Sequence, residues 1–108
     1  MKNKGLGEFE ELVLLAVCIL GSEAYGISVK NEVEKHSGRS VLLGAVHITL
    51  YRLQDKGLLQ SELGGNTNKR GDRRKRLFTI TDSGMQQLKT SRDLRYSMWQ
   101  LIPQLKLR

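Results

Sequence analysis

Apolar residues recur in the first twenty positions at the spacing of an α-helix. Residues 7–20 predict a helix whose first turn carries Glu8, Glu10 and Glu11, which are favourable near the positive end of a helix dipole. Its later part is apolar on every side, so most of its faces must be covered. In so small a protein we expect burial in a dimer as well as in its own core, with Gly21 ending the helix.

A second helix is predicted over residues 25–36. Val29 and Val33 stand one turn apart and should face inward, whereas the charged residues around them should face water. A Ser-Gly pair closes this helix, and Gly26 at its start is expected to serve the backbone only. Residues 39–43 then predict a short strand.

A third helix is predicted over residues 44–56. Val46, Leu50 and Leu53 fall at i, i+4 and i+7, which is one narrow apolar stripe. Gly57 stands just past the last turn, where a left-handed cap is usually needed. Because the stripe is narrow, the opposite face should be free. That face and its flanks hold Gly44, Ala45, His47, Ile48, Tyr51, Arg52 and Asp55.

Exposed apolar side chains are unusual on a helix this short. A contact surface would explain Ile48 and Tyr51, and packing beneath a neighbouring hairpin is the alternative. His47 is expected on the same contact surface, or otherwise at the surface beside the hairpin.

After Gly57 the apolar period changes from 3.6 to 2, which is typical of strands. Residues 58–63 and 76–80 predict two strands, and the glycines and asparagines at 64–68 supply turn chemistry. The rest of the connection, residues 69–75, is strongly basic. The segment therefore predicts a β-hairpin with a long cationic tip.

A last helix is predicted to run toward Leu101 from Thr81 or Asp82, either of which can cap it. Pro103 cannot donate a backbone hydrogen bond, so the helix should kink or fray there. Apolar residues at intervals of four, three and four form a short coiled-coil seam. With Phe9 and Leu12 of the first helix, the predicted dimer interface comprises Leu94, Met98, Leu101 and Leu105.

Positive charge is concentrated at the hairpin. The chain has 18 Lys and Arg against 11 Asp and Glu, a net charge of +7, and residues 69–76 hold six basic side chains and one acid. A charge run is usually a solvated loop, but at this place it favours a polyanion, with nucleic acid first and an anionic membrane second. A hairpin without apolar anchors would bind a membrane by charge alone.

Other function classes have little support in the sequence. Cys18 is the only cysteine and lies in an apolar run, so we expect a core residue in a reducing cytoplasm. That run, residues 12–20, is far shorter than the about twenty residues that cross a bilayer. The chain offers no Ser-His-Asp set, carboxylate pair, phosphate loop or metal-ligand spacing around His36 and His47. We therefore predict no enzyme, no cofactor and no metal site.

The order of elements is helix, helix, short strand, helix, hairpin and long helix. It predicts a mainly α fold with a small β-hairpin, in which a winged helix-turn-helix over residues 1–80 precedes a dimerisation helix over residues 81–108. An α-helix fits the major groove, where each base pair presents a distinct pattern of donors and acceptors. A cationic hairpin beside it can reach phosphates. We therefore expect a sequence-specific binder of double-stranded DNA, and the alternative is a winged helix that binds protein or RNA.

Six segments carry a family resemblance: LGEFEEL (6–12), AYGI (24–27), GAVHITLYRL (44–53), KGL (56–58), RRKR (73–76) and TITDSG (79–84). In this order and at this spacing, the sequence resembles the PadR family of bacterial transcriptional regulators, in its compact form with a single C-terminal helix. The resemblance implies a homodimer in which that helix packs against the partner's N-terminal helix. It also implies repression of a promoter that a small molecule relieves.

The sequence departs from the family pattern at three places. His47 stands where tyrosine is common in the helix that faces DNA, and it shortens the reach while keeping a ring and a hydrogen-bonding edge. Leu42 and Leu43 occupy a stretch where related sequences often have a capping serine, and Asp72 interrupts the basic tip. We expect these differences to alter the operator sequence and to leave the fold unchanged.

The predicted sites follow from the free face, the basic tip and the resemblance. Trp99, the only tryptophan, has two interpretations: it is dimer core, or it lines a central pore that holds a planar aromatic effector, as in some compact PadR-like regulators. Tyr25 is expected to be structural, stacking at the start of the second helix, and the alternative is a hydrogen bond from its hydroxyl to a phosphate. The predicted DNA contacts are Ser40, Gly44, Ala45, His47, Ile48, Tyr51 and Arg52, with Lys69, Arg70, Arg73, Arg74 and Lys75 in the hairpin.

Overall fold

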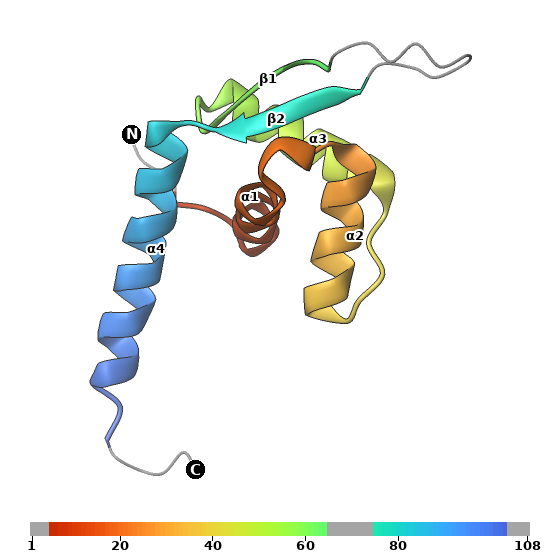
Figure 1. The fold of residues 1–108 in the computed structure, drawn as a ribbon. Coiled ribbons are helices and arrows are strands. Elements are labelled where there is room, and N and C mark those ends of the chain that lie inside the picture. The colour runs from red at the N-terminus through yellow and green to blue at the C-terminus, as the bar shows by residue number, and fades with distance from the viewer. Residues whose placement is uncertain (1–4, 65–74, 104–108) are drawn as a thin grey trace.

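The computed structural model describes residues 5–64 and 75–103 (Figure 1). Helices dominate this part of the chain, and a two-stranded antiparallel hairpin lies along one side of them. The predicted mainly α fold with a small β-hairpin is thus confirmed. The elements in order are α1 (Glu8–Leu20), the 3-10 turn η1 (Gly21–Glu23), α2 (Gly26–Ser37), α3 (Leu43–Asp55), β1 (Leu59–Leu63), β2 (Arg76–Ile80) and α4 (Asp82–Gln100).

The two strands pair in the register that places Leu59 opposite Ile80 and Leu63 opposite Arg76. Side chains alternate across the strands, so that one face packs on the helices and the other is open. On the inner face, Leu59 and Phe78 are buried, whereas on the outer face Gln60 and Thr79 are exposed and Leu77 is half-buried. This alternation confirms the predicted hairpin.

One apolar core joins the first three helices to the hairpin. The stripe predicted for α3 and the inward pair predicted for α2 both lie in it. Helix α1 is covered on one side only, because Leu15 and Ile19 on its other side are 42 % and 59 % exposed. The core comprises Val13, Leu14, Ala16, Val17, Val29, Val33, Val46, Leu50, Leu53, Leu58, Leu59 and Phe78, among others.

The strand predicted at residues 39–43 is wrong. In the described chain the only strands are β1 and β2, and the segment between α2 and α3 is irregular until α3 begins at Leu43. The edge of β2 instead meets the segment between η1 and α2, where the Phe78 backbone N–H donates to the carbonyl of Ala24 at 2.9 Å. That bond ties the free edge of β2 to the chain just before α2.

Helix α4 leaves the end of β2 and extends away from the other helices (Figure 1). Its cap confirms the prediction, because the Thr81 hydroxyl accepts from the Gly84 N–H at 3.0 Å. The helix ends at Gln100, before Pro103, as predicted. All described residues from Arg92 onward are exposed. The radius of gyration is 16.2 Å, compared with about 13 Å for a compact chain of 100 residues, because α4 projects.

We predict that Gly84→Ala destabilises the protein, although alanine is the better helix former. A Cβ at Gly84 would lie 2.7 Å from Cγ1 of Ile80 and closer still to the carbonyl oxygen of Leu58, so α4 would have to move off the hairpin. Overpacking of this kind costs about 1–3 kcal/mol. Urea unfolding measures it, with the exposed Ser83→Ala as the control. Equal free energies of unfolding for the two variants would contradict the close packing.

Candidate nucleic-acid interface

Helix α3 presents a free face opposite its buried stripe. Val46, Leu50 and Leu53 have no exposed surface, and Thr49 joins them at 5 % exposure, which the apolar pattern missed because threonine is polar. Of the residues predicted on the free face, Ala45 is half-buried. The exposed ones are Gly44, His47, Ile48, Tyr51, Arg52 and Asp55.

The two apolar residues of this face differ in their surroundings. The Tyr51 ring meets the Phe78 ring of β2 edge to face, with centroids 5.7 Å apart and planes at 76°, yet 44 % of Tyr51 stays exposed. Packing against the hairpin therefore fixes one edge of this ring and leaves the rest accessible. Ile48 is 60 % exposed. Both border a shallow hollow of about 430 Å³ that is also lined by His47, Arg52 and Asp55.

The His47 imidazole lies close to the start of α2, in space that is free because Gly26 has no side chain. A Cβ on Gly26 would lie 2.8 Å from Cδ2 of the His47 imidazole and closer still to Nε2, so only glycine leaves room for the ring. Sequence reasoning assigned Gly26 to the backbone and missed this contact. The φ angle of Gly26 is ordinary, whereas Gly57 has a φ of 79° and closes α3 as predicted.

The base of the hairpin is fastened to the helices by two members of the basic run. The Lys75 ammonium lies 4.3 Å from the centroid of the Tyr25 ring, a cation–π contact. Arg76 donates from Nη1 to the Ser61 hydroxyl at 3.0 Å, and that hydroxyl donates to Oε1 of Gln54 in α3. The Tyr25 ring thus packs against the base of the hairpin. Lys69, Arg70, Arg73 and Arg74, the other predicted basic contacts, lie outside the described residues.

The start of α2 connects the hairpin to the free face. Lys75 lies over Tyr25, and the next residue, Gly26, contacts His47. The base of the basic hairpin and the exposed side of α3 therefore both approach the start of α2, at two successive residues. Ser40, predicted to contact DNA from the linker before α3, is exposed and does not cap that helix.

An ion pair fixes the C-terminal end of α3. The Lys56 ammonium lies 2.9 Å from Oε2 of Glu10 in α1. Burial raises the pKa of Glu10, but hydrogen bonds from the Gly7 N–H and from Lys56 outweigh it and hold that pKa below its usual value. The pair therefore stabilises the fold at pH values above the ordinary pKa of a glutamate. This contribution is lost as the pH falls through the lowered pKa of Glu10.

The residues predicted to join two copies of the chain divide into two groups. On α4, Leu94, Met98 and Leu101 are 58 %, 61 % and 80 % exposed. Phe9 and Leu12 on α1 are half-buried against the protein's own core. Leu105 lies outside the described residues.

Trp99 is 59 % exposed and borders a groove of about 410 Å³ between α1 and α4. An ion pair crosses the groove, since the Arg95 guanidinium lies 3.3 Å from Oε1 of Glu11. The groove thus combines an apolar floor with charged walls. Its other lining residues are Leu15, Leu88, Lys89, Arg92 and Tyr96.

Other sites are sparse in the described part of the chain. Cys18 is half-buried, and burial raises the pKa of its thiol, which keeps it protonated. Within residues 5–64 and 75–103, no three His, Cys, Asp or Glu side chains come together as a metal site would require. None of the described helices is both long and apolar enough to span a membrane.

Comparisons with solved structures show the same fold. A PadR-like transcription factor from Bacteroides fragilis has a TM-score of 0.69 at 19 % identity, over 87 % of this chain and 85 % of that one. A PadR family regulator from Clostridium difficile has a TM-score of 0.67 at 24 % identity, over 86 % and 95 %. A PadR-like regulator from Bacillus cereus has a TM-score of 0.62 at 23 % identity, over 88 % and 93 %.

No curated protein matches the chain significantly. The model of the transcriptional regulator PadR-like family matches residues 14–90, which run from α1 through the hairpin into α4. That span includes both the free face of α3 and the base of the hairpin, and the family consists of transcriptional regulators and not of enzymes. The chain therefore belongs to the PadR-like family of transcriptional regulators.

Proposed function

We propose that this regulator binds double-stranded DNA as a homodimer in the cytoplasm and represses promoters until a small molecule releases it. The observation that carries the proposal is that Lys75 of the hairpin and His47 of α3 contact successive residues at the start of α2, Tyr25 and Gly26. This observation supports the proposal that the cationic hairpin and the free face of α3 bind the same stretch of duplex.

In this proposal α3 enters the major groove and the hairpin contacts phosphates. The exposed face of α3 can read base edges, since an α-helix fits the major groove and side chains there distinguish all base pairs. The hairpin adds affinity without sequence information, because each phosphate contact releases counterions. Base or phosphate contacts are assigned to Ser40, Gly44, Ala45, His47, Ile48, Tyr51 and Arg52, and phosphate contacts to Lys69, Arg70, Arg73, Arg74 and Lys75.

The projecting part of α4 supports the dimer. Exposed leucine and methionine side chains along one helix are costly in water and gain free energy when a second copy covers them. Residues 1–80 then act as the DNA-binding domain and residues 81–108 as the dimerisation helix. A two-fold dimer would place two copies of α3 about 34 Å apart, one turn of DNA, on a partly palindromic operator.

The first test removes the charges of the hairpin tip. The triple variant Arg73→Ala, Arg74→Ala, Lys75→Ala should weaken binding to every duplex and flatten the plot of log affinity against log salt by about 0.9 for each phosphate that the variant no longer neutralises. Fluorescence anisotropy over a salt series measures both. The matched control removes three exposed charges elsewhere, in Lys35→Ala, Lys89→Ala, Arg92→Ala. Equal slopes for both triple variants would refute the phosphate role, and a shallow slope for the unchanged protein would favour a protein or RNA partner.

A second test concerns the sequence preference assigned to α3. His47→Ala should change which duplexes are selected from a random pool, and it should alter the salt slope less than the triple hairpin variant does, because the slope reports phosphate contacts. Gly26→Ala should have the same effect, since its Cβ would displace the imidazole. A wrong base pair typically costs about 1–3 kcal/mol, so discrimination should fall by roughly fivefold or more. Gly5→Ala, with nothing within 4 Å of its Cβ, is the control. An unchanged selected sequence in His47→Ala would remove this residue from the interface.

A third test separates the two interpretations of Trp99. As the only tryptophan, it reports directly on its surroundings. If Trp99 binds a planar aromatic effector, planar cationic dyes should quench its fluorescence in a saturable way. Planar anionic dyes of the same ring size test whether the charged walls of the groove select the ligand. Absence of quenching by either dye, with the dimer intact in sedimentation, would leave Trp99 as dimer core.

A further inference from the structure

Helix α3 begins without a side-chain cap. Its N-cap residue is Leu42, and no described side chain accepts a hydrogen bond from the first turn there. Capping residues are usually Ser, Thr, Asp or Asn, whose oxygen fixes the entry of the chain into the helix. A helix that must present His47 and Ile48 in a fixed orientation therefore needs its start held in another way.

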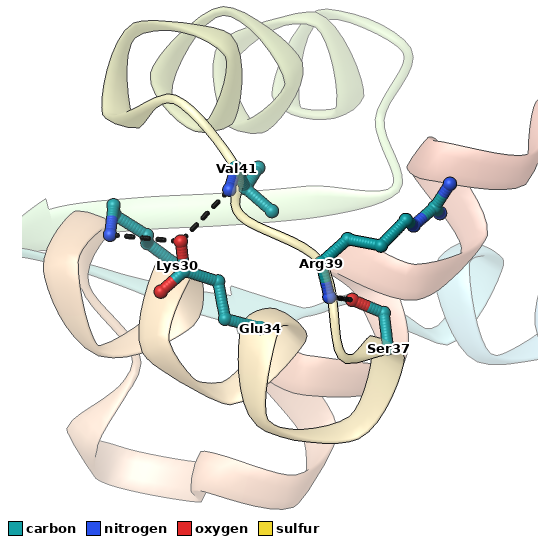
Figure 2. Close-up of polar contacts among 5 residues, drawn as sticks. All are labelled: Lys30, Glu34, Ser37, Arg39 and Val41. Carbon is teal, nitrogen blue, oxygen red and sulfur yellow. Dashed lines mark hydrogen bonds and ion pairs between the residues drawn. The ribbon is translucent and has the colours of Figure 1, made fainter.

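Glu34 of α2 holds the segment that leads into α3. Its Oε2 accepts from the Val41 backbone N–H at 2.8 Å and from the Lys30 ammonium at 3.1 Å. Figure 2 shows the carboxylate reaching from α2 across to the linker, with Lys30 on its other side. Val41 immediately precedes Leu42, the N-cap of α3, so the bond acts two residues before the first helical residue, Leu43.

The same residue also closes α2. The backbone carbonyl of Glu34 accepts from the Gly38 N–H at 2.9 Å, where Gly38 adopts a left-handed conformation with a φ of 74°. Glu34 thus binds both ends of the short linker from Gly38 to Leu42, once through its backbone and once through its side chain. Hydrogen bonds from Val41 and Lys30 also hold the pKa of this carboxyl below its usual value, so the acceptor is charged at neutral pH.

We propose that Glu34 is a positioning residue for DNA reading, which sets the entry and direction of α3 by anchoring the Val41 N–H to α2. The inference rests on the proposed function, because it assigns the reading of bases to α3. It adds a residue that lies outside the DNA face and whose contribution passes through the backbone. Charge-assisted bonds of this kind are shorter and stronger than neutral ones, and the 2.8 Å separation lies in their range.

The test compares Glu34→Ala with Glu32→Ala. Glu32 lies on the same helix, pairs with His36 at 2.8 Å and makes the same change in net charge when removed, so long-range attraction to DNA changes equally. Loss of one such bond should weaken binding of Glu34→Ala to the preferred duplex about 3- to 10-fold relative to Glu32→Ala. Its preference over a scrambled duplex should fall as well. Glu34→Gln, whose amide oxygen can still accept from Val41, should restore most of both.

A second measurement needs no DNA. Amide hydrogen exchange followed by NMR should show faster exchange at Val41 in Glu34→Ala, and near-normal exchange in Glu34→Gln and Glu32→Ala. Equal affinity and discrimination in Glu34→Ala and Glu32→Ala, or unchanged exchange at Val41, would overturn the inference while the proposed function stands. If the protein without substitutions binds no duplex, the proposed function is wrong, and the role of Glu34 in DNA reading is wrong as well.

Discussion

The burial of one narrow stripe on α3 is the constraint on which the rest of this structure depends. Val46, Leu50 and Leu53 have no exposed surface, and each such burial is worth about 1.5–3 kcal/mol. Because this stripe, with Thr49 beside it, covers only one side of α3, rotation of the helix about its axis would expose it. The hydrophobic effect thus sets which side of the helix faces out, and the free face is a consequence of the core.

Burial alone does not fix where the helix lies along its axis, since the hydrophobic effect has no direction. Directional contacts at the two ends of α3 supply that information. Lys56 pairs with Glu10 of α1 at the C-terminal end, and Glu34 of α2 holds Val41 at the N-terminal end. The hairpin adds a third fixed point through Tyr51 and Phe78. Orientation and position of the free face therefore have separate physical origins.

The sequence predicted the orientation of α3, which depends on burial, and missed the contacts that fix its position. Periodicity reports burial, so it predicted the helices, the hairpin and the stripe of α3 to within a residue or two. Contacts between elements leave no periodic signal. The pair of Lys30 and Glu34 reads as an ordinary solvated pair at i, i+4, and nothing in the sequence shows that the carboxylate also holds Val41. For the same reason the sequence suggested only a backbone role for Gly26 and did not reveal its contact with His47.

The error at residues 39–43 has a related cause. Extended, partly apolar segments predict strands only if a strand edge is available to them. Here the edge of β2 is used by Ala24, which the η1 turn brings beside Phe78. Residues 39–42 pair with no strand of the described chain and remain irregular.

The groove between α1 and α4 suggests how an effector would act on DNA binding. Glu11 and Leu15 of α1 line it, and the neighbouring residue Glu10 binds Lys56 at the end of α3. Only one helix therefore separates the proposed effector from the helix proposed to read DNA. A ligand shifts such a system only as far as its affinity differs between two arrangements. In the proposed function α4 would be the part that differs between the two arrangements, because all its described residues from Arg92 onward are exposed. Helix α1 would connect it to α3 through the pair of Glu10 and Lys56.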